Sequence, residues 1–210
     1  MKSKKLAFSI LELIFLLIIL ALIVFIARPK FKAPNITLLA NRLVVFLTYT
    51  RFLAMNDNMY EANDKRWYKK RWTFKLQRCK KSEGGLYFSI FSDTNKLGHI
   101  NKTESFKDPL EQKWLYVSNS CILKKDESPF VLLSKNYDIK SASFTCNKTK
   151  SLGQISFGYN GEVFASNSNY KDEAFANTLT KPCFLNLENK DGVKISIKIP
   201  RFFNKIAILR

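Results

Sequence analysis

The sequence predicts an α+β fold in which a long N-terminal α-helix packs on an antiparallel β-sheet domain. Three features of the 210 residues lead to this prediction. Residues 4–29 are strongly apolar, apolar residues then recur at helical spacing as far as Leu53, and later segments alternate between apolar and polar side chains. The length suits one globular domain on a membrane anchor.

The apolar run is long enough to cross a membrane. Residues 13–27 carry no charge, and residues 8–28 as a helix would span about 30 Å, the thickness of a bilayer's hydrocarbon core. Lysines and arginines flank both ends, so the positive-inside rule leaves the orientation open. Ala27 is followed by Arg28 and Pro29 rather than by the small residues of a secretory cleavage site. We therefore expect a transmembrane helix over residues 8–28.

Residues 29–63 are predicted to form the soluble half of the same helix, with Pro29 and Pro34 as points where the helix can bend. The expected buried face consists of Ile36, Leu39, Leu43, Phe46, Leu47 and Leu53. Polar residues fall largely elsewhere, at Asn41, Arg42, Thr48 and Arg51. We expect this face to pack on a sheet, although a helix that binds another protein would have the same pattern.

Residues 64–210 are predicted to form the β-rich globular domain. Two runs alternate between apolar and polar residues, from Trp72 to Gln77 and from Val193 to Ile199, so each is expected to have one buried and one solvated face. Asn160-Gly161 and Asp191-Gly192 predict tight hairpin turns, because these dipeptides accept positive φ. We expect the C-terminal half to be an antiparallel meander. Residues 82–136 read as a loop-rich insertion with strands at 86–91 and 114–117.

The N-terminus combines a basic segment, Met1 to Ala7, with Phe8, Glu12 four residues later, and Pro29. This arrangement resembles the class III signal of type IV pilins and of type II secretion pseudopilins. The resemblance implies a leader peptide over residues 1–7, cleavage by a prepilin peptidase between Ala7 and Phe8, and methylation of the new Phe8 amine. Pro29 stands twenty-second from the cut, where many pilins have a kink proline. Ala7 replaces the family's usual glycine.

Glu12 is the candidate assembly residue. A carboxylate within lipid costs about 2.5 to 3.5 kcal/mol on insertion scales unless it finds a partner. The resemblance implies that Glu12 pairs with the Phe8 amine of a neighbouring subunit and sets the register of helices in a filament. The alternative is an ordinary signal anchor in which the glutamate occurs by chance.

The C-terminal segment resembles the GspH/FimT group of minor pilins and pseudopilins, through Ile155, Phe157 and Gly161 in "ISFGYNGEVF" and through "VKISIKIPRFFNKI". The resemblance implies a pilin-like fold and a filament of other pilins or pseudopilins as partners. It also implies a single-pass protein of the bacterial inner membrane, with its C-terminal domain in the periplasm, or at the cell surface in a pilus. Pro200-Arg201 replaces the Gly-Arg element of that family.

The four cysteines, Cys79, Cys121, Cys146 and Cys183, predict two disulfides, because an extracytoplasmic domain permits oxidation. Three connectivities are possible, and we favour Cys79 with Cys121 and Cys146 with Cys183. Free buried thiols are the alternative. The cysteines lack the spacing of a zinc site, and His99 is the only histidine. With no phosphate-binding glycine loop and no serine elbow, we expect no enzyme, cofactor, metal site or small-molecule substrate.

The net charge of +18, or +15 without the leader, predicts attraction to polyanions, with double-stranded DNA as the sharpest hypothesis. Two clusters are candidates for non-specific DNA binding. They comprise Arg66, Trp67, Lys69, Lys70 and Arg71 in "KRWYKKRW", and Lys194, Lys198, Arg201, Lys205 and Arg210 near the C-terminus. Lysines outnumber arginines 27 to 8, which a solvated lysine coat encoded by an AT-rich genome would also explain.

Three functions therefore remain open from the sequence. The first is a minor pilin that binds DNA during natural transformation. The second is a structural pseudopilin of a type II secretion system that does not bind DNA. The third is an anchored periplasmic domain unrelated to filaments.

Overall fold

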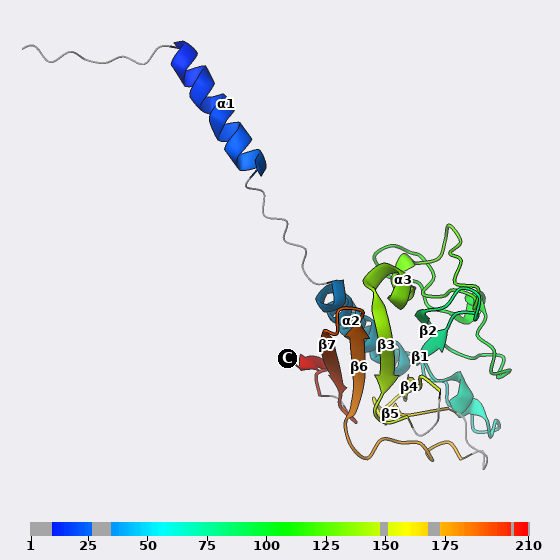
Figure 1. Cartoon of the computed structure of the whole chain (residues 1–210). Helices are drawn as coiled ribbons and strands as arrows, with labels where there is room; N and C mark the ends of the chain where they lie inside the picture. The colour runs from blue at the N-terminus through cyan, green and yellow to red at the C-terminus, as the bar shows by residue number, and fades with distance from the viewer. Residues whose placement is uncertain (1–9, 27–34, 148–150, 168–172, 203, 210) are drawn as a thin grey trace, which may run out of the picture. The chain divides into compact units, whose positions relative to one another are not determined.

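The computed structural model describes residues 10–26, 35–147, 151–167, 173–202 and 204–209. The chain divides into two compact units, Met1–Ala33 and Pro34–Arg210. The first unit contains helix α1 (Ile10–Ile26), and its side chains from 10 to 23 are exposed (Figure 1). The predictions for Ala7, Phe8, Pro29 and Arg210 lie outside the described residues and stay predictions.

The second unit combines one long helix with two four-stranded sheets. Helix α2 (Asn35–Asn56) comes first and is followed mainly by strands. The strands are β1 (Thr73–Arg78), β2 (Leu86–Phe91), β3 (Ile139–Phe144), β4 (Gln154–Phe157), β5 (Val163–Phe164), β6 (Cys183–Asn189), β7 (Lys194–Ile199) and β8 (Ala207–Leu209). Short helices are η1 (Trp67–Lys70), η2 (Lys102–Glu104), η3 (Pro129–Val131) and α3 (Leu133–Tyr137).

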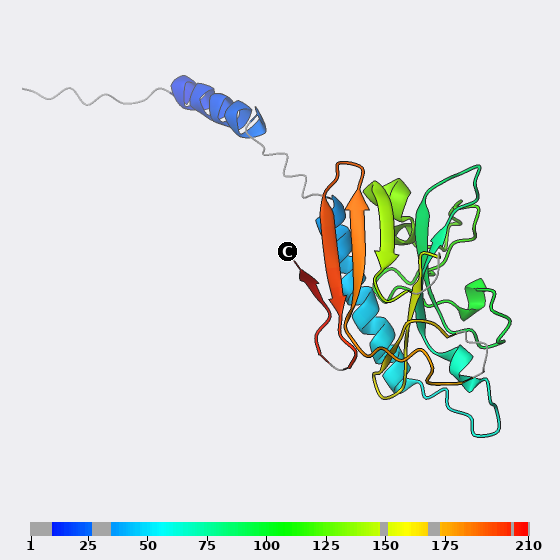
Figure 2. The same cartoon turned by 60° about the horizontal axis from the view of Figure 1, so that its bottom comes forward.

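The strand order is β2-β1-β4-β5 in one sheet and β3-β6-β7-β8 in the other, and every paired strand is antiparallel. The α+β prediction is therefore confirmed. The predicted C-terminal meander is only partly right, because β4 and β5 pair with β1 rather than with β6. Only β6, β7 and β8 follow one another as a meander (Figure 2).

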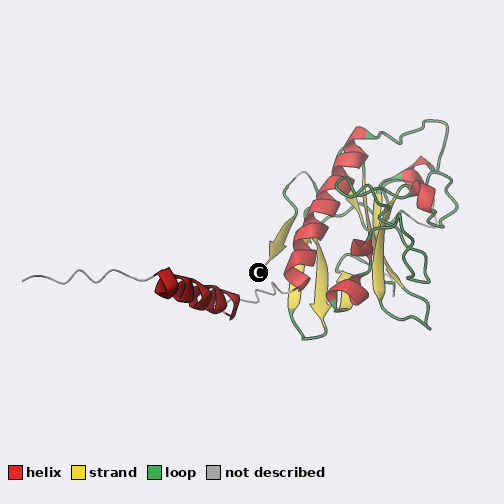
Figure 3. Cartoon of the chain, turned by 90° about the horizontal axis from the view of Figure 1, so that it is seen from above, coloured by secondary structure: helices red, strands yellow, loops and turns green. Residues whose placement is uncertain are grey.

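Helix α2 packs against both sheets, with strands β1, β4, β6, β7 and β8 in contact (Figure 3). Its buried face contains the predicted Ile36, Leu39, Leu43, Phe46 and Leu47, whereas Leu53 is half-buried. Aromatic rings extend this core across the domain, since Phe88 lies 5.9 Å from Phe46 and 4.9 Å from Phe74 between ring centroids. Phe74 of β1 in turn meets Phe144 of β3 at 6.1 Å, which ties the two sheets together.

Two details of this helix differ from the prediction. Arg51, expected on the polar face, is only 7% exposed. The helix ends at Asn56 instead of continuing to residue 63. At this end the Asn56 side chain donates to the Phe52 carbonyl at 2.8 Å, and Asp57 accepts a bond from the Trp72 indole N–H at 3.0 Å. These polar contacts turn the chain away from the helix axis toward β1.

By length and composition, α2 is the one helix among the described residues that could span a membrane. However, 44% of its apolar window is buried within the domain. The sheets therefore account for much of its hydrophobicity. Helix α1 is shorter in the described part of the chain, at seventeen residues.

Both predicted hairpin turns are present. Gly161 has φ +75° between β4 and β5, and Gly192 has φ +80° between β6 and β7, a backbone region that glycine enters without a Cβ penalty. The predicted strand at 114–117 is wrong, because Trp114 forms only isolated bridges to Lys107 and Glu127. Leu115 is nonetheless fully buried, so its apolar character reflects burial without a strand.

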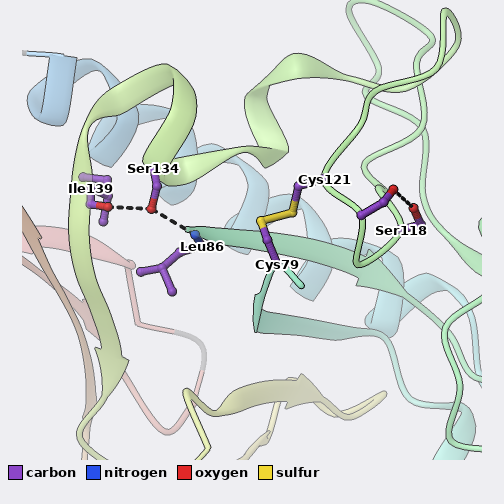
Figure 4. The surroundings of a disulfide bond; sticks show 7 residues. Cys79, Leu86, Ser118, Cys121, Ser134 and Ile139 are labelled. Atoms are coloured by element: carbon purple, nitrogen blue, oxygen red, sulfur yellow. Dashed lines mark hydrogen bonds between the residues drawn. A yellow bond between two sulfur atoms is a disulfide. The ribbon is translucent and has the colours of Figure 1, made fainter. Parts of the chain in front are cut away.

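The structure contains the favoured disulfides, Cys79–Cys121 and Cys146–Cys183. The first joins the end of β1 to the loop-rich insertion (Figure 4). Beside it, the Ser134 hydroxyl accepts a bond from the Leu86 N–H at 2.9 Å and donates to the Ile139 carbonyl at 2.6 Å. Ser134 thus connects β2 with β3, and the disulfide holds the insertion against the first sheet.

Loss of either disulfide should reduce the free energy of unfolding by about 4 kcal/mol, because the bonds close loops of 42 and 37 residues in the unfolded chain. Urea unfolding of the paired Cys→Ser variants, followed by tryptophan fluorescence, would measure this loss. A midpoint that does not move after complete reduction of the wild-type protein would contradict the expectation.

Candidate functional site

Glu12 lies in the first turn of α1 and is the only charged residue of this helix. Its side chain is exposed. The N-terminal end of a helix favours a carboxylate by about 0.3 to 1 kcal/mol through the helix dipole. The position is therefore locally compatible with a negative charge, and the carboxylate is accessible to another chain.

The "KRWYKKRW" segment forms η1 and leads into β1. Two of its candidate DNA-binding residues are buried, with Trp67 at 7% and Arg71 at 3% exposure. Both lie in an aromatic cluster, where the Arg71 guanidinium carbon is 3.6 Å from the ring centroid of Phe164 and 4.9 Å from that of Trp67. In this structure neither side chain is available to a polyanion.

Arg71 has a structural role instead. Its Nη1 donates to the Ala174 carbonyl at 2.7 Å, which fastens the segment after β5 to the start of β1. Burial lowers the pKa of Arg71 to about 10, partly offset by the attraction of Glu162, so the side chain stays charged at neutral pH. The aromatic faces around it stabilise this buried cation.

The remaining cations of this segment differ in exposure. Lys70 is largely buried and forms an ion pair with Glu61, while Lys69 is half-buried. Lys65 and Arg66 are exposed. The sequence analysis missed the exposed rings near Trp67, because they come from distant segments: Tyr60 at 53%, Tyr159 at 37% and Phe175 at 54% exposure.

The C-terminal candidates form a more accessible group. Lys194, Lys198, Arg201 and Lys205 are all exposed. Lys194 and Lys198 share the outer face of β7, and Arg201 and Lys205 lie on the loop that leads to β8. Glu188 stands opposite Lys194 on β6 and reduces the local positive charge.

Arg51 of α2 holds this C-terminal loop. Its guanidinium donates to the Asn204 carbonyl at 3.0 Å and to the Pro200 carbonyl at 3.4 Å, on either side of Arg201. Burial lowers the pKa of Arg51. A buried arginine on the main helix therefore fixes the backbone that carries two exposed cations. Its distant partners could not be identified from the helical pattern.

His99 is exposed, and within the described ranges no three histidine, cysteine or acidic residues are grouped to hold a metal ion. Comparison of the chain with protein-family models, with curated proteins and with solved structures found no match. The argument for function therefore depends on the exposed carboxylate of α1 and the exposed cations of the C-terminal region.

The contrast between Arg71 and Arg66 can be measured. Arg71→Met should lower the free energy of unfolding by about 2 to 4 kcal/mol, because it removes a buried charge-assisted hydrogen bond and the ring contacts. Arg66→Met, an equal change at an exposed position, should alter it by less than about 0.5 kcal/mol. Urea unfolding of both variants provides the comparison, and equal losses would contradict the assigned role of Arg71.

Proposed function

We propose that this protein is a membrane-anchored, pilin-like subunit that assembles into a type IV pilus or pseudopilus and binds DNA without sequence specificity. The observation that carries the proposal is α1, an exposed apolar helix whose only charged residue is Glu12, in its first turn. The resemblance of residues 1–29 to a prepilin signal supports the same function.

The energetics of Glu12 favour a partner over an isolated carboxylate. The seventeen residues of α1 span about 26 Å, close to the thickness of a hydrocarbon core. The helix dipole offsets at most about 1 kcal/mol, against about 2.5 to 3.5 kcal/mol for an acid within the bilayer. An amine of a neighbouring subunit, such as that of Phe8 after cleavage, would supply the missing stabilisation.

Helix α2 also presents an apolar surface to other chains. Leu38, Val45 and Phe52 are spaced seven residues apart on one side of the helix and are 49%, 60% and 55% exposed. Apolar residues with this period are typical of helices that pack along one another. The stripe therefore suits the lateral packing of helices that a filament requires.

The DNA-binding part of the proposal depends on Lys194, Lys198, Arg201 and Lys205. Exposed lysines and arginines bind phosphates and release counterions, which produces affinity without base readout. Arg51 places two of these cations on a fixed loop. A structural pseudopilin with a solvated lysine coat is the second candidate, favoured by the spread of lysines over the whole chain.

Glu12→Gln should leave membrane insertion intact and prevent incorporation into filaments, because it removes the charge but keeps the size of the side chain. Immunoblots of membrane and sheared filament fractions would measure both properties. Glu12→Asp preserves the charge and should retain at least part of the assembly. Mass spectrometry should show an N-terminal methylated Phe8. Normal assembly of Glu12→Gln, or a retained leader, would contradict the filament function.

Replacement of Lys194, Lys198, Arg201 and Lys205 by glutamine should weaken duplex binding. Each lost phosphate contact should reduce the slope of log K against log salt by about 0.9. Electrophoretic shifts of the full chain in an uncharged polyoxyethylene detergent, over a salt series, would measure both quantities.

A matched control removes four exposed lysines elsewhere, Lys80, Lys81, Lys124 and Lys125. This variant has the same net charge as the first but keeps the C-terminal group. Equal weakening of DNA binding by the two variants would show that only total charge matters. Absence of binding by the wild-type protein at low salt would favour the structural pseudopilin.

A further inference from the structure

The first sheet has a polar face on the side opposite the hydrophobic core. Cross-strand pairing puts Thr73 and Lys75 of β1 on the same face as Ser89 of β2 and as Gln154 and Ser156 of β4. The sequence pattern predicted solvent here, yet Thr73, Ser89 and Ser156 are each at most 1% exposed. Other segments therefore cover this face, and they leave a pocket of about 250 Å³ over part of it.

The walls of this pocket come from separate parts of the chain. Lys75 and Gln154 belong to the sheet, Lys69 to η1, and Asp93 and Lys96 to the loop after β2. Asn167 closes another side and donates to the Thr73 hydroxyl at 2.9 Å. Because six polar side chains from distant positions converge, the pocket has the form of a small polar ligand site.

Two acceptor atoms in the pocket lack a hydrogen-bond partner among the described residues. Asp93 is only 7% exposed; its Oδ2 accepts from the Gly98 N–H at 3.0 Å, whereas its buried Oδ1 is unpaired. The buried Oδ1 of Asn167 is also unpaired. Buried acceptors normally have donors, so these atoms suit a ligand that carries hydroxyl groups.

The charges indicate a second property of the ligand. Lys69, Lys75 and Lys96 contribute three ammonium groups, and Asp93 and the Lys96 partner Asp64 contribute two carboxylates. One positive charge is therefore in excess. Burial lowers the pKa of Lys75, against the smaller opposing effect of Asp93, which is the response of a cation without sufficient counter-charge.

We propose that this pocket binds a single sugar ring bearing one anionic group, a carboxylate or a phosphate. The lysines would bind the anion, while Asp93 Oδ1 and Asn167 Oδ1 would accept from the ring hydroxyls. Phe91 also lines the pocket and offers an apolar surface to the C–H groups of the ring. The volume lies below the roughly 300 to 1,000 Å³ of drug-sized sites, which suits a monosaccharide. This inference is independent of filament assembly and of DNA binding.

Titration calorimetry of the full chain in an uncharged polyoxyethylene detergent, at about 0.15 M salt, would test the proposal. The probes are glucuronate and glucose 6-phosphate, with glucose and inorganic phosphate as controls. We expect at least one acidic sugar to bind with a Kd below about 1 mM. Glucose and inorganic phosphate should bind at least about tenfold more weakly, because each lacks one of the two recognised features. Binding of only one acidic sugar would identify the preferred anion.

Variants connect such binding to the pocket. Lys75→Gln and Asp93→Asn should each weaken the acidic sugar at least about tenfold, whereas Lys140→Gln, at an exposed position on β3, should leave affinity unchanged. Thermal unfolding would establish that each variant is folded, and Asp93→Asn provides the test should Lys75→Gln not fold. The proposal is overturned by absence of binding, by equal affinity for glucose or phosphate, or by unchanged affinity in a folded pocket variant.

Discussion

The packing of α2 across both sheets is the constraint on which the rest of the second unit depends. The helix contacts strands from each sheet, and its buried residues meet the aromatic column through Phe46 and Phe88. Arg51 on this same helix fixes the loop between β7 and β8. Because the buried side of α2 is committed to the sheets, only its opposite side, with Leu38, Val45 and Phe52, is available to another chain.

Features encoded by neighbouring residues could be predicted from the sequence. The buried face of α2 follows from helical periodicity, and the turns at Gly161 and Gly192 follow from residues that accept positive φ. The disulfides join the cysteines that are adjacent in sequence. The distribution of strands between two sheets was not predictable, because β4 pairs with β1 across about 80 residues of chain, and no local pattern specifies such a partner.

Burial of polar residues explains the other differences. Alternation in β1 correctly placed Phe74 and Leu76 in the core, but it reports only which face is apolar. It does not report whether loops cover the other face, as they do over Thr73 and Lys75. The same ambiguity applies to "KRWYKKRW", since arginine next to tryptophan suits both a nucleic-acid surface and a buried cation among rings. The partners Phe164 and Ala174 decide for burial of Arg71, and they lie about 100 residues away.

The two candidate binding regions of the second unit differ in the selectivity that their physics permits. Lys194, Lys198, Arg201 and Lys205 are exposed, so salt screens them and their attraction depends on charge rather than shape. Asp93 in the pocket is held in a covered environment, where an unsuitable group would leave buried polar atoms unpaired. The exposed group is thus suited to a repetitive polyanion, while the pocket is suited to discriminate among small molecules. One domain can contain both, because the β7–β8 loop and the covered face of β1 belong to different sheets.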